Sequence, residues 1–155
     1  MRPNEMQSRL QGDEQTPHLH CKRPVQTLLS VPFCFLRYII AFAYEKWRLA
    51  EYPELAAKIV HASLEDDTLG YDVMSFETDG RVRYVEVKAT EGPLVTRFFI
   101  SANEIAYAEQ HSDQFLILRV GNVRNKPVCC EIRDMKAELD LKPAVFECAF
   151  KPIDE

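Results

Sequence analysis

The dipeptide Asp79-Gly80 joins two strand-like segments, and no other feature of the chain constrains the fold as strongly. Asp-Gly between such segments is a strong signal for a β-hairpin. A loop of three residues, 78–80, would place the glycine in the left-handed conformation of a bulged turn. In that register Asp72 lies directly opposite Glu86. A loop of two residues would shift the pairing by one and put the two carboxylates on opposite faces of the sheet.

Two facing carboxylates need a physical reason, because like charges at directly opposed positions destabilise a sheet. Side chains alternate along a strand, so Glu86 and Lys88 point to one face and Val87 points to the other. Mg²⁺ binds oxygen ligands, commonly one or two carboxylates completed by water and phosphate. The pattern predicts that Asp72, Glu86 and the backbone carbonyl of Val87 bind Mg²⁺ or Mn²⁺. Lys88 would then lie beside the attacking water or the scissile phosphate.

A purely structural interpretation of the same residues stays open. Alternating charges are common on half-exposed strands, and Glu-x-Lys by itself occurs by chance in many proteins. The metal-site hypothesis therefore depends on the register that adds Asp72 to Glu86 and Lys88.

The remaining patterns predict two longer helices and five strands. One helix is expected over residues 42–63, with a break at Pro53. Ser101 and Glu104 match a capping box, so a second helix should begin there and end near His111. The strands are expected at residues 70–76, 82–90, 96–100, 115–120 and 128–133, with one short helix and an extended tail after them. The order αβββαβ, followed by one further strand, predicts a mixed α/β (α+β) domain with a central mixed sheet.

The N-terminal segment, residues 1–43, is expected to belong poorly to this domain. Residues 1–24 are polar and aperiodic, which predicts disorder. Residues 25–43 are the most apolar stretch of the chain, and three interpretations stay open. Pro32 and Arg37 interrupt the roughly 20 apolar residues that a membrane span needs. A basic pair precedes the run as in a signal peptide, but it comes late. We favour the third interpretation, an element that covers the core or forms a homodimer surface.

Composition limits the classes of function. The chain has 155 residues, which suits one domain, and its net charge of −5 excludes a strongly basic nucleic-acid binder. The acidic excess lies after residue 43, in the predicted domain 44–133 and the C-terminal extension 134–155. The five cysteines are odd in number and irregularly spaced, so no disulfide framework is expected. Free thiols favour a cytoplasmic protein.

An Asp followed by Glu-x-Lys within an αβββαβ order resembles the PD-(D/E)xK nuclease superfamily, whose core is restriction-endonuclease-like. Residues 44–133 also resemble the NO VEIN-type C-terminal domain family. Members of that nuclease-like family occur alone or attached to helicase and restriction–modification proteins. The matching segments are residues 44–46, 48–49, 59–63, 69–73, 75–76, 85–88, 98–101 and 103–104, and His111.

This resemblance implies a Mg²⁺-dependent endonuclease that cleaves DNA or RNA, in defence or restriction, with helicase or restriction–modification partners. By the same resemblance Asp72 and Glu86 would bind the metal, and Lys88 would be the catalytic lysine. Further residues match the family motif without an assigned role, and these are Gly70, Tyr71, Ser101, Asn103 and Glu104.

The chain departs from the family at one position. A Gly-x-x-Gly-Glu segment usually precedes the stretch that matches Tyr44-Glu45-Lys46, and its acid is thought to support the metal. That acid should fall near Tyr38, where residues 35–40 contain none. The missing acid supports an alternative function, a catalytically inactive module that binds nucleic acid or another protein.

Overall fold

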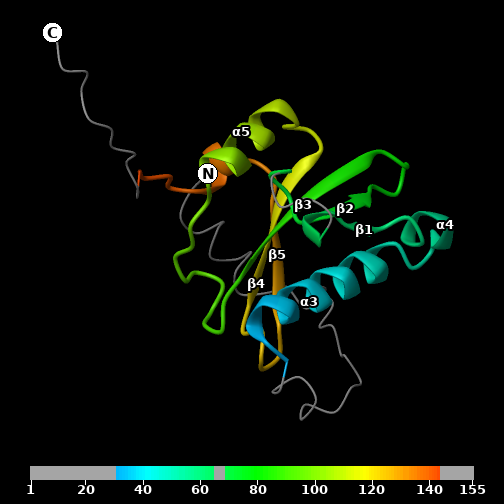
Figure 1. Ribbon diagram of the computed structural model, residues 1–155, viewed down its shortest axis with the longest axis horizontal. Helices are drawn as coiled ribbons and strands as arrows, with labels where there is room; N and C mark the ends of the chain where they lie inside the picture. The colour runs from blue at the N-terminus through cyan, green and yellow to red at the C-terminus, as the bar shows by residue number, and fades with distance from the viewer. Residues whose placement is uncertain (1–30, 65–68, 144–155) are drawn as a thin grey trace, which may run out of the picture.

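The computed structural model describes residues 31–64 and 69–143 (Figure 1). The helices are α3 (Phe33–Arg48), α4 (Pro53–Ala56), α5 (Ala102–Gln110) and α6 (Met135–Glu138), with a 3-10 helix η1 (Ala62–Leu64). The strands are β1 (Val60–His61), β2 (Val73–Phe76), β3 (Val82–Ala89), β4 (Phe115–Gly121) and β5 (Val128–Ile132). The described residues therefore form the mixed α/β architecture that the sequence predicts.

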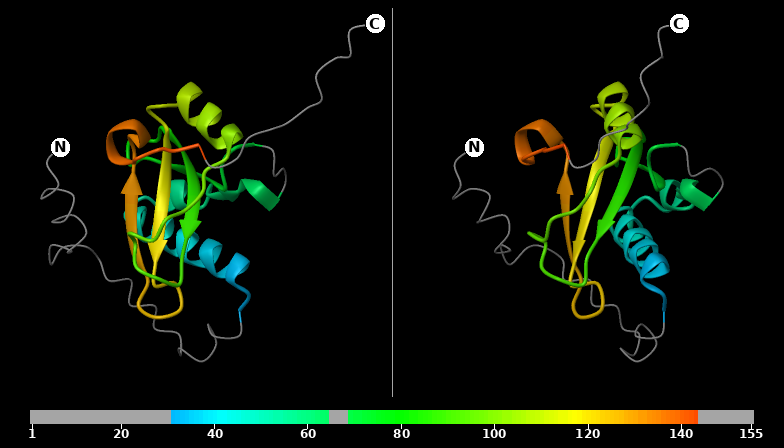
Figure 2. Two further views of the ribbon diagram at one scale, coloured as in Figure 1. Left: turned by 90° about the vertical axis from the view of Figure 1, so that its left-hand side faces the viewer. Right: turned by 60° about the vertical axis from the view of Figure 1, so that its left-hand side comes forward.

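The five strands form one mixed sheet in the order β1-β2-β3-β4-β5. β3 and β4 are parallel, and the other three neighbouring pairs are antiparallel. The connection between the parallel strands contains α5, as a parallel crossover requires. In Figure 2, α3 lies along one face of the sheet, whereas α5 and α6 lie at the other.

The predicted hairpin register is confirmed. Val73 lies opposite Val85, and the amide of Glu77 donates to the carbonyl of Arg81 over 2.8 Å. The loop consequently has three residues, and Gly80 has a φ of 88°, a conformation that favours glycine. Asp72 directly precedes β2, and Glu86 directly follows Val85, the last residue paired with β2, on β3.

Each face of the sheet is covered by its own apolar cluster. On the α3 side, Leu36 and Ile40 pack against Val85 and other buried residues of the strands. Spacing of four residues puts these side chains on one stripe of the helix. On the other side, residues of α5, α6 and the loop before α5 pack against Phe115 and its neighbours. The sheet is thus a central layer between two apolar cores. The candidate site lies at the edge of these cores.

The expected start of the first helix was wrong. α3 begins at Phe33, not near residue 42, and it runs on to Arg48 without a break. Pro32 stands at the N-cap, where a fixed φ and a missing amide proton cost little, so it begins a helix and does not merely interrupt an apolar run. After Arg48 the helical pattern ends, Pro53 begins the short α4, and residues 60–61 form β1.

The expected strand at residues 96–100 was also wrong, because those residues form an irregular segment. The buried guanidinium of Arg119 on β4 holds the loop in that shape. It donates to the carbonyls of Leu94 (3.1 Å), Thr96 (2.7 Å) and Lys88 (2.9 Å) and lies 4.8 Å from the ring centroid of Phe98. The αβββαβ order is nevertheless retained, because three strands, β1, β2 and β3, precede α5.

Residues 33–43 cover the core, as the favoured interpretation of the apolar segment predicts. Within residues 31–64 and 69–143, no helix combines the length and apolarity needed to span a membrane. The predicted short helix after residue 133 is confirmed as α6. The predictions for residues 1–24 and for the extended tail beyond residue 143 lie outside the described residues.

Candidate active site

Asp72 and Glu86 come together at the end of the β2–β3 hairpin. The amide of Asp72 donates over 3.0 Å to the carbonyl of Val85, the residue that faces Val73, so the regular pairing ends at Val73–Val85 and does not bring Asp72 directly opposite Glu86. The amide of Val87 donates to Oδ2 of Asp72 over 2.9 Å and fixes that carboxylate against β3. Both carboxylates are buried, with exposures of 6% for Asp72 and 5% for Glu86. Two acids of the predicted set thus share one small, poorly hydrated space.

The ionisation of Glu86 reflects this crowding. Burial, together with the nearby negative charge of Asp72, raises the pKa of Glu86 from 4.5 to about 7. Lys88, whose Nζ lies 2.9 Å from Oε1 of Glu86, opposes the shift without cancelling it. The ionised form of Glu86 is therefore unfavourable in this site, chiefly because the carboxylate is buried.

Lys88 lies between two carboxylates. Its Nζ is 2.9 Å from Oε1 of Glu86 and 2.6 Å from Oε2 of Glu104. Burial lowers the pKa of Lys88, but the two carboxylates outweigh burial, and the pKa lies above its ordinary value. Lys88 is therefore a protonated, positively charged group at neutral pH.

Glu104 stands in the first turn of α5 and belongs to the predicted capping box, which is confirmed. The amide of Glu104 donates to Oγ of Ser101, and the amide of Ser101 donates to Oε2 of Glu104, each over 3.2 Å. The same Oε2 accepts from Lys88, so one oxygen serves both the helix end and the site. Asn103 occupies the neighbouring position of the same turn.

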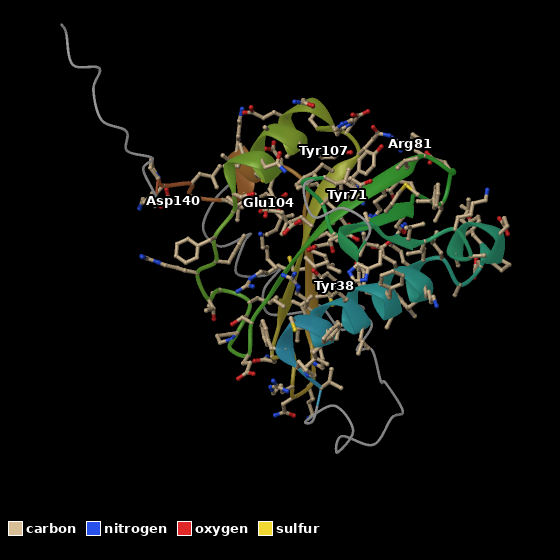
Figure 3. All side chains as sticks on the ribbon, viewed as in Figure 1. Tyr38, Tyr71, Arg81, Glu104, Tyr107 and Asp140 are labelled. Carbon is tan, nitrogen blue, oxygen red and sulfur yellow. The ribbon has the colours of Figure 1, made fainter. Side chains whose placement is uncertain are left out.

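Gly70 and Tyr71 place α5 beside the segment that leads to Asp72. Gly70 has a φ of 82°, and a Cβ at this position would lie 2.9 Å from Cβ of Tyr107 on α5. The ring of Tyr71 packs against Tyr84 and Tyr107, with centroids 4.7 and 5.1 Å apart (Figure 3). These two motif residues therefore act in the packing of the helix that carries Glu104.

Helix α3 presents Tyr38, not an acid, to the site (Figure 3). Its hydroxyl donates to Oδ1 of Asp72 over 3.1 Å and accepts from Ser63 over 3.3 Å. Burial raises the pKa of Tyr38, which keeps its proton and acts as a donor. The guanidinium of Arg37 lies 4.0 Å from the same Asp72 oxygen. The ring of His61 packs against that of Tyr38 at a tilt of 53°, with the ring centroids 4.0 Å apart. Tyr38 was noted in the sequence only as the place of a missing acid. Residues 59–63, with His61 and Ser63, were noted only as a family-matching segment, and Arg37 only as an interruption of the apolar run.

Glu45, the nearest acid on α3, points elsewhere. Its carboxylate accepts from Ser75 over 2.7 Å and from Arg48 over 2.9 Å, and it lies 3.2 Å from the guanidinium of Arg83. Both Glu45 and Arg83 are fully buried. The ion pairs continue outward through Glu77, Glu131 and Arg133. This second cluster joins α3 to the sheet and contributes no ligand to the Asp72–Glu86 pair.

The donor set suits Mg²⁺ or Mn²⁺ in one way and falls short in another. Neighbouring carboxylates are what a hard divalent cation binds, with water and substrate phosphate completing its shell. Among the described residues, no group of three or more His, Cys, Asp or Glu side chains is arranged to hold a metal. For Val87 the structure shows an amide that donates to Asp72, while its carbonyl as a ligand stays a prediction.

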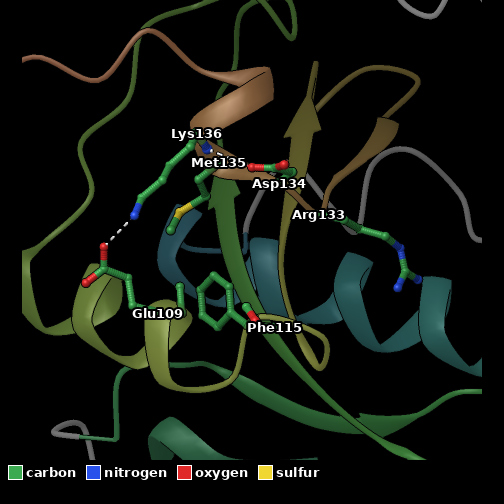
Figure 4. Close-up of a pocket in the computed structure, with 8 residues that line it drawn as sticks. Glu109, Phe115, Arg133, Asp134, Met135 and Lys136 are labelled. Carbon is green, nitrogen blue, oxygen red and sulfur yellow. Dashed lines mark hydrogen bonds and ion pairs between the residues drawn. The ribbon is translucent and has the colours of Figure 1, made fainter.

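A separate pocket lies between α5, α6 and the start of β4 (Figure 4). Its lining includes Ala108, Phe115 and Met135 and none of Asp72, Glu86 or Lys88. An ion pair of 2.9 Å between Glu109 and Lys136 crosses its rim. The pocket is therefore distinct from the candidate site, although both involve α5.

A five-stranded mixed sheet flanked by helices, with a buried Asp and Glu and a partly buried Lys at one hairpin, defines an α+β domain with a polar site at the sheet. Comparison with protein families matches residues 39–132 to the C-terminal domain of the protein NO VEIN. The chain belongs to this family, as its sequence motifs indicate. Searches of curated proteins and of solved structures found no match.

Proposed function

We propose that this chain is a metal-dependent, nuclease-like domain that hydrolyses phosphodiester bonds in DNA or RNA. The observation that supports the proposal is the placement of the buried carboxylate of Asp72 against β3, where Glu86 is also buried and Lys88 lies 2.9 Å from Glu86. The raised pKa of Glu86 supports it, because a bound cation would remove the unfavourable negative charge.

In this proposal Asp72 and Glu86 hold Mg²⁺ or Mn²⁺. The cation supplies Lewis acidity, which polarises a phosphate oxygen and lowers the pKa of a water molecule. Val87 fixes one oxygen of Asp72 through its amide, so that the carboxylate is oriented before the cation arrives. The positive charge of Lys88 stabilises the negative charge that develops on the phosphate in the transition state.

The experiment measures Mg²⁺- or Mn²⁺-dependent cleavage of plasmid and single-stranded DNA and RNA by the full chain and by Lys88→Ala. The exposed Lys136, on α6, provides the matched control Lys136→Ala. We expect cleavage by the wild type and the control, inhibition by EDTA, and loss of cleavage in Lys88→Ala. Equal cleavage by all three proteins would contradict the assignment.

A second candidate function is a catalytically silent module that binds nucleic acid or a protein partner. The contacts of Tyr38 and Arg37 with Asp72 favour it, since a cation so close to the carboxylate competes electrostatically with a metal. Titration calorimetry with Mn²⁺ separates the two functions. A silent site gives no saturable binding that Asp72→Asn abolishes, whereas a nuclease site does.

The wider context of the activity belongs to the same proposal. A role in defence or restriction, a helicase or restriction–modification partner, a homodimer and a cytoplasmic location all stay predictions. Pull-down with a tagged full-length chain and its sedimentation behaviour would test the partner and the dimer.

A further inference from the structure

Glu104 has two kinds of partner, and a capping box explains only one of them. Its Oε2 accepts from the amide of Ser101, which satisfies a free N–H at the start of α5. The same oxygen lies 2.6 Å from Nζ of Lys88, a distance typical of a strong charge-assisted hydrogen bond. A glutamate that served the helix alone would need no lysine beside it.

The groups around Lys88 hold its ammonium in one position. Glu86 contacts it at 2.9 Å from its own strand, and Glu104 contacts it from α5. From the neighbouring strand β4, Arg119 is directly opposite, but its guanidinium is directed to the carbonyls of Leu94, Thr96 and Lys88. The ammonium of Lys88 is thus held between a carboxylate of β3 and a carboxylate of α5.

The position of Glu104 is fixed from both directions along the chain. The capping box orients its side chain at the first turn of α5. The close approach of Gly70 to Tyr107 packs that helix against the chain two residues before Asp72. A single packing contact therefore places Asp72 and Glu104 relative to each other, with Lys88 between their elements.

We propose that Glu104 is a positioning residue of the candidate site, which holds the ammonium of Lys88 beside Glu86 and so ties the site to helix α5. Its role in the reaction rests on the proposed nuclease function. Its hold on Lys88 is a property of the protein alone. The helix that follows the catalytic strand is then part of the machinery, and the family-motif position of Glu104 has a reason beyond capping.

The test replaces Glu104 by Gln in the full chain. Gln still accepts at the N-cap, so the capping box and the fold are retained, but the negative charge beside Lys88 is lost. Glu109→Gln is the matched control, because it makes the same change on the same helix and removes an exposed ion pair with Lys136 (Figure 4). Glu104→Asp keeps the charge on a shorter side chain.

The first readout needs no activity. An ammonium held in a partly buried ion pair exchanges its protons slowly, so Lys88 should give a resolved ¹H–¹⁵N signal from Nζ. We expect this signal in the wild type and in Glu109→Gln, its loss in Glu104→Gln, and its partial return in Glu104→Asp. A Lys88 signal unchanged in Glu104→Gln would overturn the proposal, whether or not the wild type cleaves nucleic acid.

The second readout separates positioning from binding. If the wild type cleaves, Glu104→Gln should lower kcat at least about tenfold with little change in KM, because the interaction matters most when charge develops in the transition state. Glu109→Gln should match the wild type. A rise in KM with unchanged kcat would contradict a positioning role. Absence of cleavage in the wild type would count against the proposed function and leave the first readout to decide this inference.

Discussion

The hydroxyl of Tyr38 donates a hydrogen bond of 3.1 Å to Oδ1 of Asp72, so helix α3 offers the candidate site a phenol where the family resemblance implies a carboxylate. A neutral donor satisfies one oxygen of Asp72 but adds no negative charge. Affinity for a divalent cation should therefore be limited at this position.

Restoring an acid at residue 38 should strengthen metal binding. Tyr38→Glu brings a third carboxylate close to Asp72, and we expect Mn²⁺ to bind about tenfold more tightly or better. Tyr38→Phe, which only removes the hydroxyl, is the control for the lost hydrogen bond. Titration calorimetry measures both. Equal Mn²⁺ affinity in the two variants would show that residue 38 does not act on the metal.

Glu86 should make the stability of the metal-free protein fall as pH rises. Its folded pKa of about 7 lies above the ordinary 4.5, so the native state binds more protons than the unfolded state between these values. Stability is then fully present below pH 4.5 and is lost as pH rises through 7. The free energy of unfolding in urea with EDTA should drop by on the order of 2–3 kcal/mol across this window.

Glu86→Gln provides the check on this assignment, because Gln does not titrate. The variant should lack the fall in stability and be more stable than the wild type above pH 7. Mn²⁺ should stabilise the wild type at that pH but not the variant. A fall of the same size in Glu86→Gln would assign the effect to another group.

Gly70 should be far less tolerant of substitution than Gly80, although the two have similar φ values of 82° and 88°. A Cβ at residue 70 meets Cβ of Tyr107 at 2.9 Å, whereas one at residue 80 meets nothing within 4 Å. We expect Gly80→Ala to cost about 1 kcal/mol of unfolding free energy for backbone strain, and Gly70→Ala about 2 kcal/mol or more. Urea denaturation measures both. Equal losses would mean that contact with α5 contributes little.

Glu45 should matter for stability and not for the site. Glu45→Gln leaves the buried guanidinium of Arg83 with less compensation and should cost about 3 kcal/mol. Asp79→Asn, which breaks the fully exposed pair with Arg81, should change stability little. Mn²⁺ affinity should be unaltered in both variants. Weaker Mn²⁺ binding in Glu45→Gln at full stability would instead place Glu45 in the site.

The hairpin could be predicted because its information is local. Asp79-Gly80 fixes the turn, and the turn fixes the register from Phe76–Val82 to Val73–Val85. The direct opposition of Asp72 and Glu86 was also expected from this register, but the regular pairing ends one residue short of Asp72. The capping box of Ser101 and Glu104 was equally local and equally correct. The local pattern could not predict the second partner of Glu104, because Lys88 lies on another element.

The wrong predictions concern segments whose backbone conformation depends on side chains distant in the sequence, or whose pattern is too short to recognise. Residues 96–100 have the apolar character of a strand, yet Arg119 takes the carbonyls of Leu94 and Thr96 and keeps the segment out of the sheet. The two-residue β1 is too short to leave a period in the sequence. The start of α3 was missed because Pro32 was taken as an interruption of the apolar run and not as a helix start.

The contacts that build the site differ in their separation along the chain. Val87 reaches Asp72 across 15 residues within one hairpin, whereas Tyr38 reaches it across 34. Local contacts form early in folding, so the two carboxylates meet while still hydrated, and the cost of desolvating them falls on the later docking of α3. A divalent cation should therefore slow unfolding more than it speeds refolding, which stopped-flow measurements with and without Mn²⁺ would detect. The site would then form in two kinetic stages. The hairpin first brings the two carboxylates together, and the docking of α3 then buries them.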